Sequence, residues 1–526
     1  MTPKVLISDK LSTRAVDLFK QRGIDADFKP GMKPEELMDV IADYDGLAVR
    51  SATKVTADVF ARTDRLKVVG RAGIGVDNID VEAATQSGVV VMNTPFGNSI
   101  TTAEHAIAMM MSLARQIPVA NASTHSGKWE KSRFMGVEMF GKTLGLIGIG
   151  NIGSIVADRA HGLKMHVIAF DPYLSPQRAA ELGVEKVELD DLYRRADFIT
   201  VHTPLTDTTR NMINSAAFDK MRDGVRIVNC ARGGIIHEAD LADALEGGKV
   251  AGAALDVFAE EPAKENVLFG RDDVVVTPHL GASTEEAQEN VAIQVAEQMS
   301  DYLLDGAVTS ALNMPSVSAE DAPKLMPYMK LAEQLGSFAG QITETGLKGV
   351  TLEFEGHVAS LNTRPLMQAA VAGLLTPLLD SVNMVNAPMI ARDRSIDVSE
   401  IKHDRPGAYQ TLIRLTVTTE RFTRSVAGTL FAGDKPRIVD IKGIPIEAEL
   451  TQHMLYITNE DKPGLVGHLG SVLGDAQVNI ASFHLGRSSP GETAIALIQV
   501  DQPIVPELLS AIQTLPSVVQ AKLLHF

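Results

Sequence analysis

The hydrophobic pattern divides the chain into an alternating N-terminal part and a C-terminal part of different character. From residue 4 to about residue 305, short β-branched runs alternate with longer stretches in which apolar residues recur at helical spacing. This alternation is typical of parallel sheets wound by helices, an α/β fold. The following runs are predicted to be strands: KVLISD, GLAVR, LKVVGRAG and VVVMNTP, then, after an interruption, TLGLIG, MHVIAFD, DFITVHTP, VRIVNCA, VAGAALDVF and DVVVTPH.

Two long helices are predicted to connect the two sets of strands. Within residues 101–115 apolar side chains recur on one face, and Thr101 with Glu104 has the spacing of a capping box. A second helix is predicted to begin at Ser283, with Glu286 in the capping-box position. Both helices are candidate hinges. We therefore expect two Rossmann-like lobes, of which the first is formed by residues 1–98 with a return helix in 285–312, and the inserted one by residues 99–284.

The pattern changes after residue 312. The stretch DGAVTSALNMPSVSAEDAP is rich in small residues and proline and marks a boundary. Residues 313–450 mix helices with strands and predict a separate α+β domain. Residues 451–526 follow the order β-α-β-β-α-β, which predicts a ferredoxin-like domain.

The composition is that of an ordinary globular protein, with 45% apolar and 22% charged residues in a chain of 526. The single cysteine, Cys230, excludes an intrachain disulfide and favours a reducing, cytoplasmic location. The N-terminus lacks the apolar run of a signal peptide, and no window approaches about 18 uninterrupted apolar residues, which argues against a membrane span. The net charge of −17 disfavours nonspecific binding to nucleic acid or to anionic membranes.

The glycine motif GIGNIG stands between the predicted strand TLGLIG and a helical stretch. In a dinucleotide site, Gly148 would permit a tight turn, Gly150 would let a pyrophosphate approach the backbone, and Gly153 would allow close helix packing. Asp171 closes the next predicted strand, about 20 residues further on, where its carboxylate could accept both ribose hydroxyls. Because that carboxylate would repel a 2′-phosphate, the pattern favours NAD over NADP. Two alternatives remain: the glycines could form a tight turn that binds no ligand, and Asp171 could be a helix-capping or solvated surface residue.

Three polar residues follow the ends of three successive predicted strands, namely Arg232, Glu261 and His279. Because the carboxyl ends of parallel strands meet at one edge of a sheet, these side chains are expected to converge. Their chemistry suits oxidation of a secondary alcohol: His279 as general base, Glu261 as acceptor from its other ring nitrogen, and Arg232 as a fork for a substrate carboxylate. Each also has a plain alternative: a loop histidine, a solvated glutamate and an ion-paired arginine.

These motifs resemble those of the NAD-dependent D-2-hydroxyacid dehydrogenase family, and most closely its long-form branch that acts on 3-phosphoglycerate and carries two regulatory domains. The resemblance implies that Arg232, Glu261 and His279 form the active-site trio and that NAD is the cofactor, with no metal. It also implies oxidation of 3-phosphoglycerate to 3-phosphohydroxypyruvate, the first step of L-serine biosynthesis. The similar segments cover most of residues 1–312: VRSATKV, GRAGIGVDNID, NTPFGNS, AEH, GLIGIGNIG, FDPY, VHTPLT, VNCARGGII, GAALDVFAEEP and TPHLGAST.

The resemblance also implies ligand contacts in both lobes. Arg50 and Arg71 each end a predicted strand, so anion binding is favoured there, whereas Arg133 could contact a neighbouring subunit or be a solvated surface charge. Cys230 would act through its backbone. The implied cofactor contacts, besides the motif glycines, are Ile74, Asn151, Ile152, Asp171, Thr203, Cys230, Ala231, Asp256, Gly281 and Ala282. The implied substrate contacts are Arg50, Ser51, Arg71, Gly73, Gly75, Asn98 and Arg133.

The two C-terminal domains resemble regulatory modules. For residues 313–450 the family implies a small anionic effector, although Arg364, Arg392 and Arg394 are expected to be solvated charges. Residues 451–526 resemble an ACT domain, and a homodimer or homotetramer is expected. The family often has His and Asn where this chain has Asn and Asp, so an oligomerisation module without effector is the alternative. The positions that match L-serine-binding residues are Asn459, Asp461 and Asn479.

Two other functions fit the same lobes. A glyoxylate or hydroxypyruvate reductase would share the catalytic trio, but the tail domains and the first-lobe arginines disfavour it. A dinucleotide-sensing scaffold without catalysis is disfavoured by the intact acid–base and carboxylate-binding positions.

Overall fold

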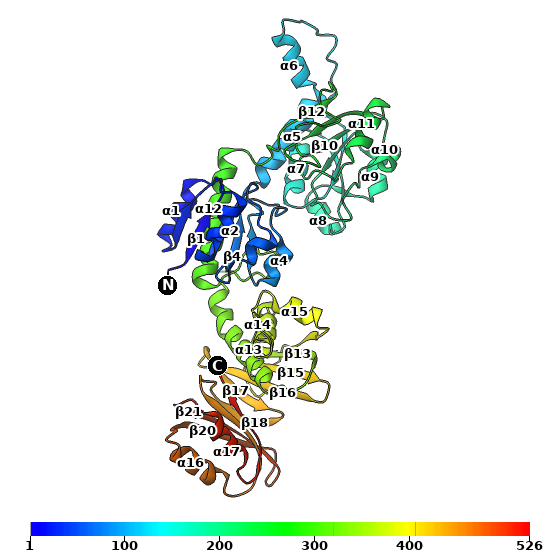
Figure 1. The fold of residues 1–526 in the computed structure, drawn as a ribbon. Coiled ribbons are helices and arrows are strands. Elements are labelled where there is room, and N and C mark those ends of the chain that lie inside the picture. Colours follow the sequence, from blue (N-terminus) through cyan, green and yellow to red (C-terminus); the bar gives the residue numbers. More distant parts are fainter. Residues whose placement is uncertain (1, 319, 406) are drawn as a thin grey trace.

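The first lobe is built on a parallel sheet in the order β2-β1-β3-β4-β5 (Figure 1). The computed structural model describes residues 2–318, 320–405 and 407–526. The strands of this sheet are β1 Lys4–Ile7, β2 Asp25–Phe28, β3 Gly46–Val49, β4 Val68–Arg71 and β5 Val90–Asn93. Its helices are α1 Thr13–Gln21, α2 Pro34–Val40, α3 Ala57–Phe60 and α4 Val81–Gln86, with a 3-10 turn at Ile41–Asp43. The strand β2 is additional to the predicted ones.

The inserted lobe is a parallel sheet in the order β12-β11-β10-β9-β6-β7-β8. Its strands are β6 Thr143–Ile147, β7 His166–Phe170, β8 Glu185–Lys186, β9 Phe198–Val201, β10 Val225–Asn229, β11 Val250–Leu255 and β12 Val274–Val276. Its helices are α6 Ile117–His125, α7 Asn151–Gly162, α8 Pro176–Glu181, α9 Leu189–Arg195, α10 Ser215–Lys220 and α11 Glu238–Glu246. The strands β10, β11 and β12 are neighbours, so the segments that follow them leave one edge of the sheet together.

Helices α5 (Ser99–Ala114) and α12 (Glu285–Asp305) carry the chain between the two lobes. Both predicted capping boxes are wrong. Helix α5 begins earlier than predicted, with Asn98 at the N-cap, so Thr101 already lies inside its first turn. At α12 the cap is Thr284, whose hydroxyl accepts from the backbone N–H of Ala287 at 3.2 Å. This start places two glutamates in the first turn, at the positive end of the helix dipole.

The C-terminal residues form two further sheets. The first is mixed, in the order β14-β13-β15-β16-β17-β18, and the second is antiparallel in the ferredoxin-like order β20-β21-β19-β22. The predicted fold class is therefore confirmed. The strands are β13 Leu347–Gly356, β14 Asp397–His403, β15 Thr411–Thr419, β16 Thr423–Phe431, β17 Lys435–Ile441, β18 Ile444–Ala448, β19 Met454–Glu460, β20 Ile480–Arg487, β21 Thr493–Val500 and β22 Val518–Leu524. The helices are α13 Ala322–Gln341, α14 Arg364–Leu375, α15 Ala387–Asp393, α16 Leu465–Asp475 and α17 Pro506–Gln513, with a 3-10 turn at His357–Ser360.

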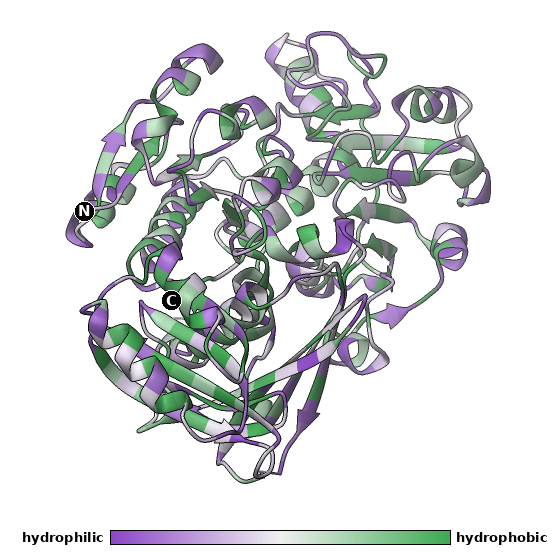
Figure 2. Cartoon of the chain, turned by 60° about the horizontal axis from the view of Figure 1, so that its bottom comes forward, coloured by the Kyte–Doolittle hydropathy of each residue, from purple (hydrophilic) through white to green (hydrophobic). Residues whose placement is uncertain are grey.

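The core lies on the strands and on the helix faces that cover them, where Figure 2 shows apolar residues in green. In the first lobe α12 packs on β4 so closely that a Cβ on Gly70 would lie 2.6 Å from a methyl group of Val295. This packing holds the end of β4, and with it Arg71, against the return helix. Among the described residues, no helix is long and apolar enough to cross a membrane.

Candidate functional site

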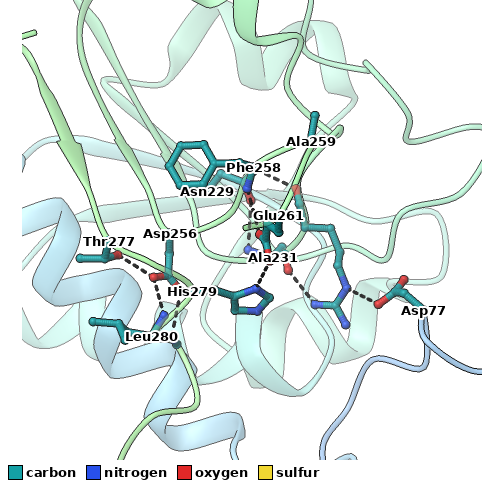
Figure 3. Close-up of polar contacts among 12 residues, drawn as sticks. Asp77, Asn229, Ala231, Asp256, Phe258, Ala259, Glu261, Thr277, His279 and Leu280 are labelled. Carbon is teal, nitrogen blue, oxygen red and sulfur yellow. Dashed lines mark hydrogen bonds and ion pairs between the residues drawn. The ribbon is translucent and has the colours of Figure 1, made fainter. Parts of the chain in front are cut away.

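The ends of β10, β11 and β12 bring predicted catalytic residues together. Asn229 pairs with Leu255, and Leu255 pairs with Val276, so the three strands finish in register. Just beyond, Glu261 Oε2 lies 2.7 Å from His279 Nδ1 (Figure 3). Because Nδ1 faces the carboxylate, the opposite ring nitrogen, Nε2, points away from Glu261 and can meet a substrate hydroxyl.

The Glu261 carboxylate is kept ionised by its hydrogen bonds. Burial by itself would raise its pKa, but the contact with His279 and the backbone N–H of Phe258, which donates to Oε1 at 3.0 Å, outweigh burial and hold the pKa below its usual value. The carboxylate is thus an acceptor that fixes which ring nitrogen of His279 carries the proton.

The loop that carries His279 is held by the carboxylate of Asp256, which is completely buried. Asp256 accepts from the backbone N–H groups of Leu280 and Gly281 at 2.7 and 2.8 Å, and from the Thr277 hydroxyl at 2.5 Å. His279 itself has a φ of 56°, and its N–H donates to the Asp256 carbonyl at 2.9 Å. Asp256 is predicted as a cofactor contact, but in the structure its carboxylate accepts hydrogen bonds that hold this loop in shape.

A further member of this network was not predicted. His105 Nε2 on α5 lies 3.2 Å from an Asp256 carboxylate oxygen and 3.2 Å from the Thr277 hydroxyl. Burial would raise the pKa of Asp256, but the bonds from His105, Thr277 and Leu280 hold the pKa below its usual value. The segment AEH contains His105, yet nothing in the sequence pairs it with a distant aspartate.

The three glycines of the motif have the geometry that a dinucleotide site requires. Gly148 has a φ of 90°, and a Cβ there would lie 2.7 Å from the His202 carbonyl oxygen. Gly150 is the N-cap of α7 and has open space where a Cβ would be. A Cβ on Gly153 would lie 2.2 Å from the Gly148 carbonyl oxygen, so only glycine permits this approach of helix to strand. The open approach at Gly150, in front of the N-terminus of α7, fits a pyrophosphate.

The other predicted cofactor positions surround this loop. Asp171 accepts from the backbone N–H of Ile149 at 3.0 Å and from that of Tyr173 at 2.8 Å, so each carboxylate oxygen retains acceptor capacity for a ribose hydroxyl. Thr203 Oγ1 is buried without a hydrogen-bond partner among the described residues, as expected of a group that awaits a ligand. Asn151 and Ile152 open α7, Ala231 follows β10, and Gly281 and Ala282 follow His279 in the Asp256-held loop.

Cys230 is buried, and burial strongly raises the pKa of its thiol. A thiolate is therefore disfavoured, which agrees with a role for its backbone only.

Arginines of both lobes gather around the turn at residues 73–75. A Cβ on Gly73 would lie 1.7 Å from Arg71 Nη1, and a Cβ on Gly75 would lie 1.5 Å from Arg232 Nη2, so both guanidinium groups rest on a backbone without side chains. Burial, and then the positive charge of Arg232, lower the pKa of Arg71 to about 10, with Arg50 acting in the same direction. Arg71 Nε is buried and has no partner in the described parts of the chain. Arg71 and Arg232 at this turn, with the charge of Arg50 acting on Arg71, make it a candidate site for an anion.

The remaining predicted positions are the cofactor contact Ile74 and the substrate contacts Ser51, Asn98 and Arg133. Ile74, whose carbonyl accepts from Asn93 Nδ2 at 2.6 Å, lies on the turn between the arginines. Ser51 follows Arg50 and is exposed, and Asn98 Oδ1 is buried without a partner in the regions that the structure describes. Arg133 is not brought to the arginine cluster. Its guanidinium contacts Glu130 at 3.1 Å and Asp272 at 2.7 Å.

In the C-terminal domain the predicted effector residues are held by neighbours of their own. Asp461 accepts from the Gly491 N–H at 3.0 Å and from Arg487 at 3.2 Å, and these bonds lower its pKa. Asn479 Nδ2 donates to Asp501 at 2.7 Å. Asn459 Oδ1 is buried with no partner among the described residues.

Three family models match the chain. Residues 107–281 match "D-isomer specific 2-hydroxyacid dehydrogenase, NAD binding domain", residues 324–442 match "D-3-phosphoglycerate dehydrogenase intervening domain", and residues 453–517 match "ACT domain". The predicted NAD cofactor agrees with the first match.

Curated relatives match over nearly the whole chain. The D-3-phosphoglycerate dehydrogenase of Synechocystis is 45% identical over 97% of this chain and 92% of its own length. The enzyme of the same name from Bacillus subtilis is 42% identical over 99% of both chains.

Solved structures match the two lobes. A glyoxylate reductase from Paecilomyes thermophila is 28% identical, with a TM-score of 0.55, over 59% of this chain and 98% of that one. The apo D-lactate dehydrogenase of Escherichia coli is 29% identical, with a TM-score of 0.53, over 59% of this chain and 99% of that one. Because the resemblance of curated sequences extends through all the domains, the chain belongs to the D-3-phosphoglycerate dehydrogenases, a branch of the NAD-dependent D-isomer-specific 2-hydroxyacid dehydrogenases.

Proposed function

We propose that this chain catalyses the NAD-dependent oxidation of 3-phosphoglycerate to 3-phosphohydroxypyruvate, the first step of L-serine biosynthesis. The observation that carries this proposal is the contact of 2.7 Å between Glu261 and His279 at the strand ends that also carry Arg232. The relatives bear the corresponding enzyme name. The arginine cluster favours a phosphorylated 2-hydroxy acid over the unphosphorylated substrates of a glyoxylate reductase.

Each of the three residues has a separate role in the proposed reaction. Arg232 holds the substrate carboxylate and so orients the secondary alcohol, and His279 Nε2 takes the hydroxyl proton as the C–H hydride leaves. Glu261 holds the imidazole and stabilises the imidazolium that forms. The turn at 148–153 and Asp171 would hold NAD, whose nicotinamide would accept the hydride. In the reverse direction His279 returns the proton to the carbonyl oxygen.

Arg50 and Arg71 are the proposed phosphate ligands. Arg71 is half-buried and lies against Gly73, and Arg50 directly follows β3. A phosphate would supply the negative charge that this cluster of cations needs.

Replacing Glu261 by Gln is expected to lower kcat at least about 100-fold, because an amide neither stabilises the imidazolium nor secures the tautomer of His279. The KM for both substrates should change little, since Glu261 contacts neither. The measurement is initial-rate NADH formation. Glu260→Gln, on the exposed neighbouring carboxylate, is the matched control and should retain wild-type rates. A Glu261→Gln enzyme with the kcat of the wild type would contradict the assigned role.

Replacing Arg50 by Ala should raise the KM for 3-phosphoglycerate roughly tenfold or more, because a charge-assisted hydrogen bond to phosphate contributes about 1.5–3 kcal/mol. The KM for an unphosphorylated 2-hydroxy acid should change much less. Steady-state kinetics with both substrates measures the difference, and Arg62→Ala, an exposed arginine of the same lobe, is the control. Equal effects on the two substrates would count against phosphate recognition.

We further propose a homodimer or a homotetramer in which the segment around α6 contacts a second copy. Figure 1 shows this segment extending away from the inserted lobe. It carries Trp129, Met135 and Phe140, which are 86%, 79% and 73% exposed in the single chain. Apolar side chains so placed are typical of an interface. Arg133 lies on the same segment, and it could contact the partner only by exchanging its present pairing with Asp272.

The double substitution Trp129→Glu and Met135→Glu should dissociate this assembly, since it would place unpaired carboxylates in an apolar contact. Light scattering on a size-exclusion column measures the mass. Val267→Glu, at another exposed apolar position, should leave the mass unchanged. An unaltered mass of the double variant would refute the interface.

For the C-terminal domain we propose L-serine as an inhibitor that binds Asn459, Asp461 and Asn479. The buried, unsatisfied Asn459 Oδ1 supports a polar ligand, whereas Arg487 already engages Asp461. Titration of L-serine into the assay is expected to inhibit at up to millimolar concentrations, with D-serine as the control. Asn479→Ala should weaken inhibition without changing kcat. Absence of inhibition over that range would leave this domain as an oligomerisation module.

We propose a cytoplasmic location, because the single cysteine of this long chain is buried and the chain needs no oxidising compartment.

A further inference from the structure

We propose that Asp77 sets the affinity for substrate by acting as an internal carboxylate that occupies Arg232 and must give way to the carboxylate of the incoming 2-hydroxy acid. This inference rests on the proposed function, since it concerns the same anion site. Asp77 lies just beyond the 73–75 turn of the first lobe, whereas Arg232 follows β10 of the inserted lobe. The contact therefore also joins the two lobes.

The guanidinium fork of Arg232 is engaged on both of its binding edges. Nε donates to Asp77 Oδ2 at 2.9 Å and Nη1 donates to the Ala231 carbonyl at 2.7 Å, the two dashed contacts that reach the labelled Asp77 and Ala231 in Figure 3. Nη2 lies against Gly75. A carboxylate that binds side-on needs Nε together with one terminal nitrogen. A substrate carboxylate can take that edge only if Asp77 leaves it.

Displacement of the Asp77 side chain requires little rearrangement. The side chain is 65% exposed, whereas that of Arg232 is 27% exposed, so Asp77 can turn into solvent while Arg232 stays in place. The backbone beside it is fixed, because Asn78 Nδ2 donates to the carbonyl oxygens of Arg50 at 2.7 Å and Thr53 at 2.6 Å. The loop can thus remain where it is while one side chain swings.

Charge gives Asp77 opposite effects in the free and the bound site. In the free protein its carboxylate offsets the repulsion between Arg71 and Arg232, both of which face it. Once a substrate brings its own carboxylate and phosphate, Asp77 becomes a like charge beside them. It therefore stabilises the free site and opposes the bound one.

The test is the substitution Asp77→Asn, which keeps the shape and removes the charge. We expect 3-phosphoglycerate to bind roughly fivefold more tightly, the effect of one partly exposed ion pair of about 1 kcal/mol. Isothermal titration into the NADH-saturated protein measures the Kd without turnover. The KM for NAD should stay unchanged, and the gain should shrink as salt is added.

Asp80→Asn is the matched control. Asp80 lies three positions along, and its carboxylate caps α4 by accepting from the Ala83 N–H at 2.9 Å, a role that asparagine also fills. The same change in net charge should alter the Kd less than twofold. Inorganic phosphate, which has no carboxylate for Arg232, should gain less from Asp77→Asn than 3-phosphoglycerate does. An unchanged or weaker Kd for 3-phosphoglycerate in Asp77→Asn would overturn the inference and make Asp77 a support for Arg232 instead.

An error in the proposed substrate can be told apart from an error in the proposed role of Asp77. If the wild type does not bind 3-phosphoglycerate, the proposed substrate is wrong, and the same ratio of Kd values is measured with the 2-hydroxy acid that the wild type oxidises. Thermal unfolding of each variant shows whether it is folded. If Asp77→Asn does not fold, Asp77→Ser serves as a second variant that removes the charge.

Discussion

The parallel register of β10, β11 and β12 is the constraint on which the site depends. Because these strands finish together, the segments that follow them emerge at one edge of the sheet, where Glu261 and His279 meet. A parallel sheet buries its strands on both faces, so chemistry can be placed only at the strand ends. The position of the proposed catalytic pair thus follows from the way in which the core is built.

The loop after β12 has to be held in an uncommon conformation for this to work. His279 adopts a positive φ, which a non-glycine residue occupies only when its surroundings compensate. The cost of this conformation is offset by the buried Asp256 carboxylate, which accepts hydrogen bonds from the backbone N–H groups of Leu280 and Gly281. A buried charge is costly, but His105 and the Thr277 hydroxyl supply the remaining partners. Structure and catalysis therefore share one polar network.

The proposed substrate site has a local charge opposite to that of the whole protein. The chain carries a net charge of −17, yet the guanidinium groups of Arg71 and Arg232 lie against the glycines of one turn, and the charge of Arg50 also acts on Arg71. Such a cluster is unstable without counter-charge, which Asp77 provides inside the protein. Under the proposed role of Asp77, the affinity for an anion reflects both the attraction of the cations and the cost of releasing Asp77 from Arg232.

Periodicity and local backbone requirements are enough to predict the α/β class, the glycine motif and the polar residues at the strand ends. Gly148 and Gly153 show the physical need directly, since a side chain at either would strike the backbone. Helix starts were placed wrongly at Thr101 and Ser283, because several Ser, Thr and Asn residues compete for a cap and packing selects among them. The contacts of Asp77 with Arg232, of His105 with Asp256, and of Arg133 with Asp272 rather than with the arginine cluster are seen only in the folded chain. Those contacts join residues that are distant in sequence, and no local pattern encodes such a partner.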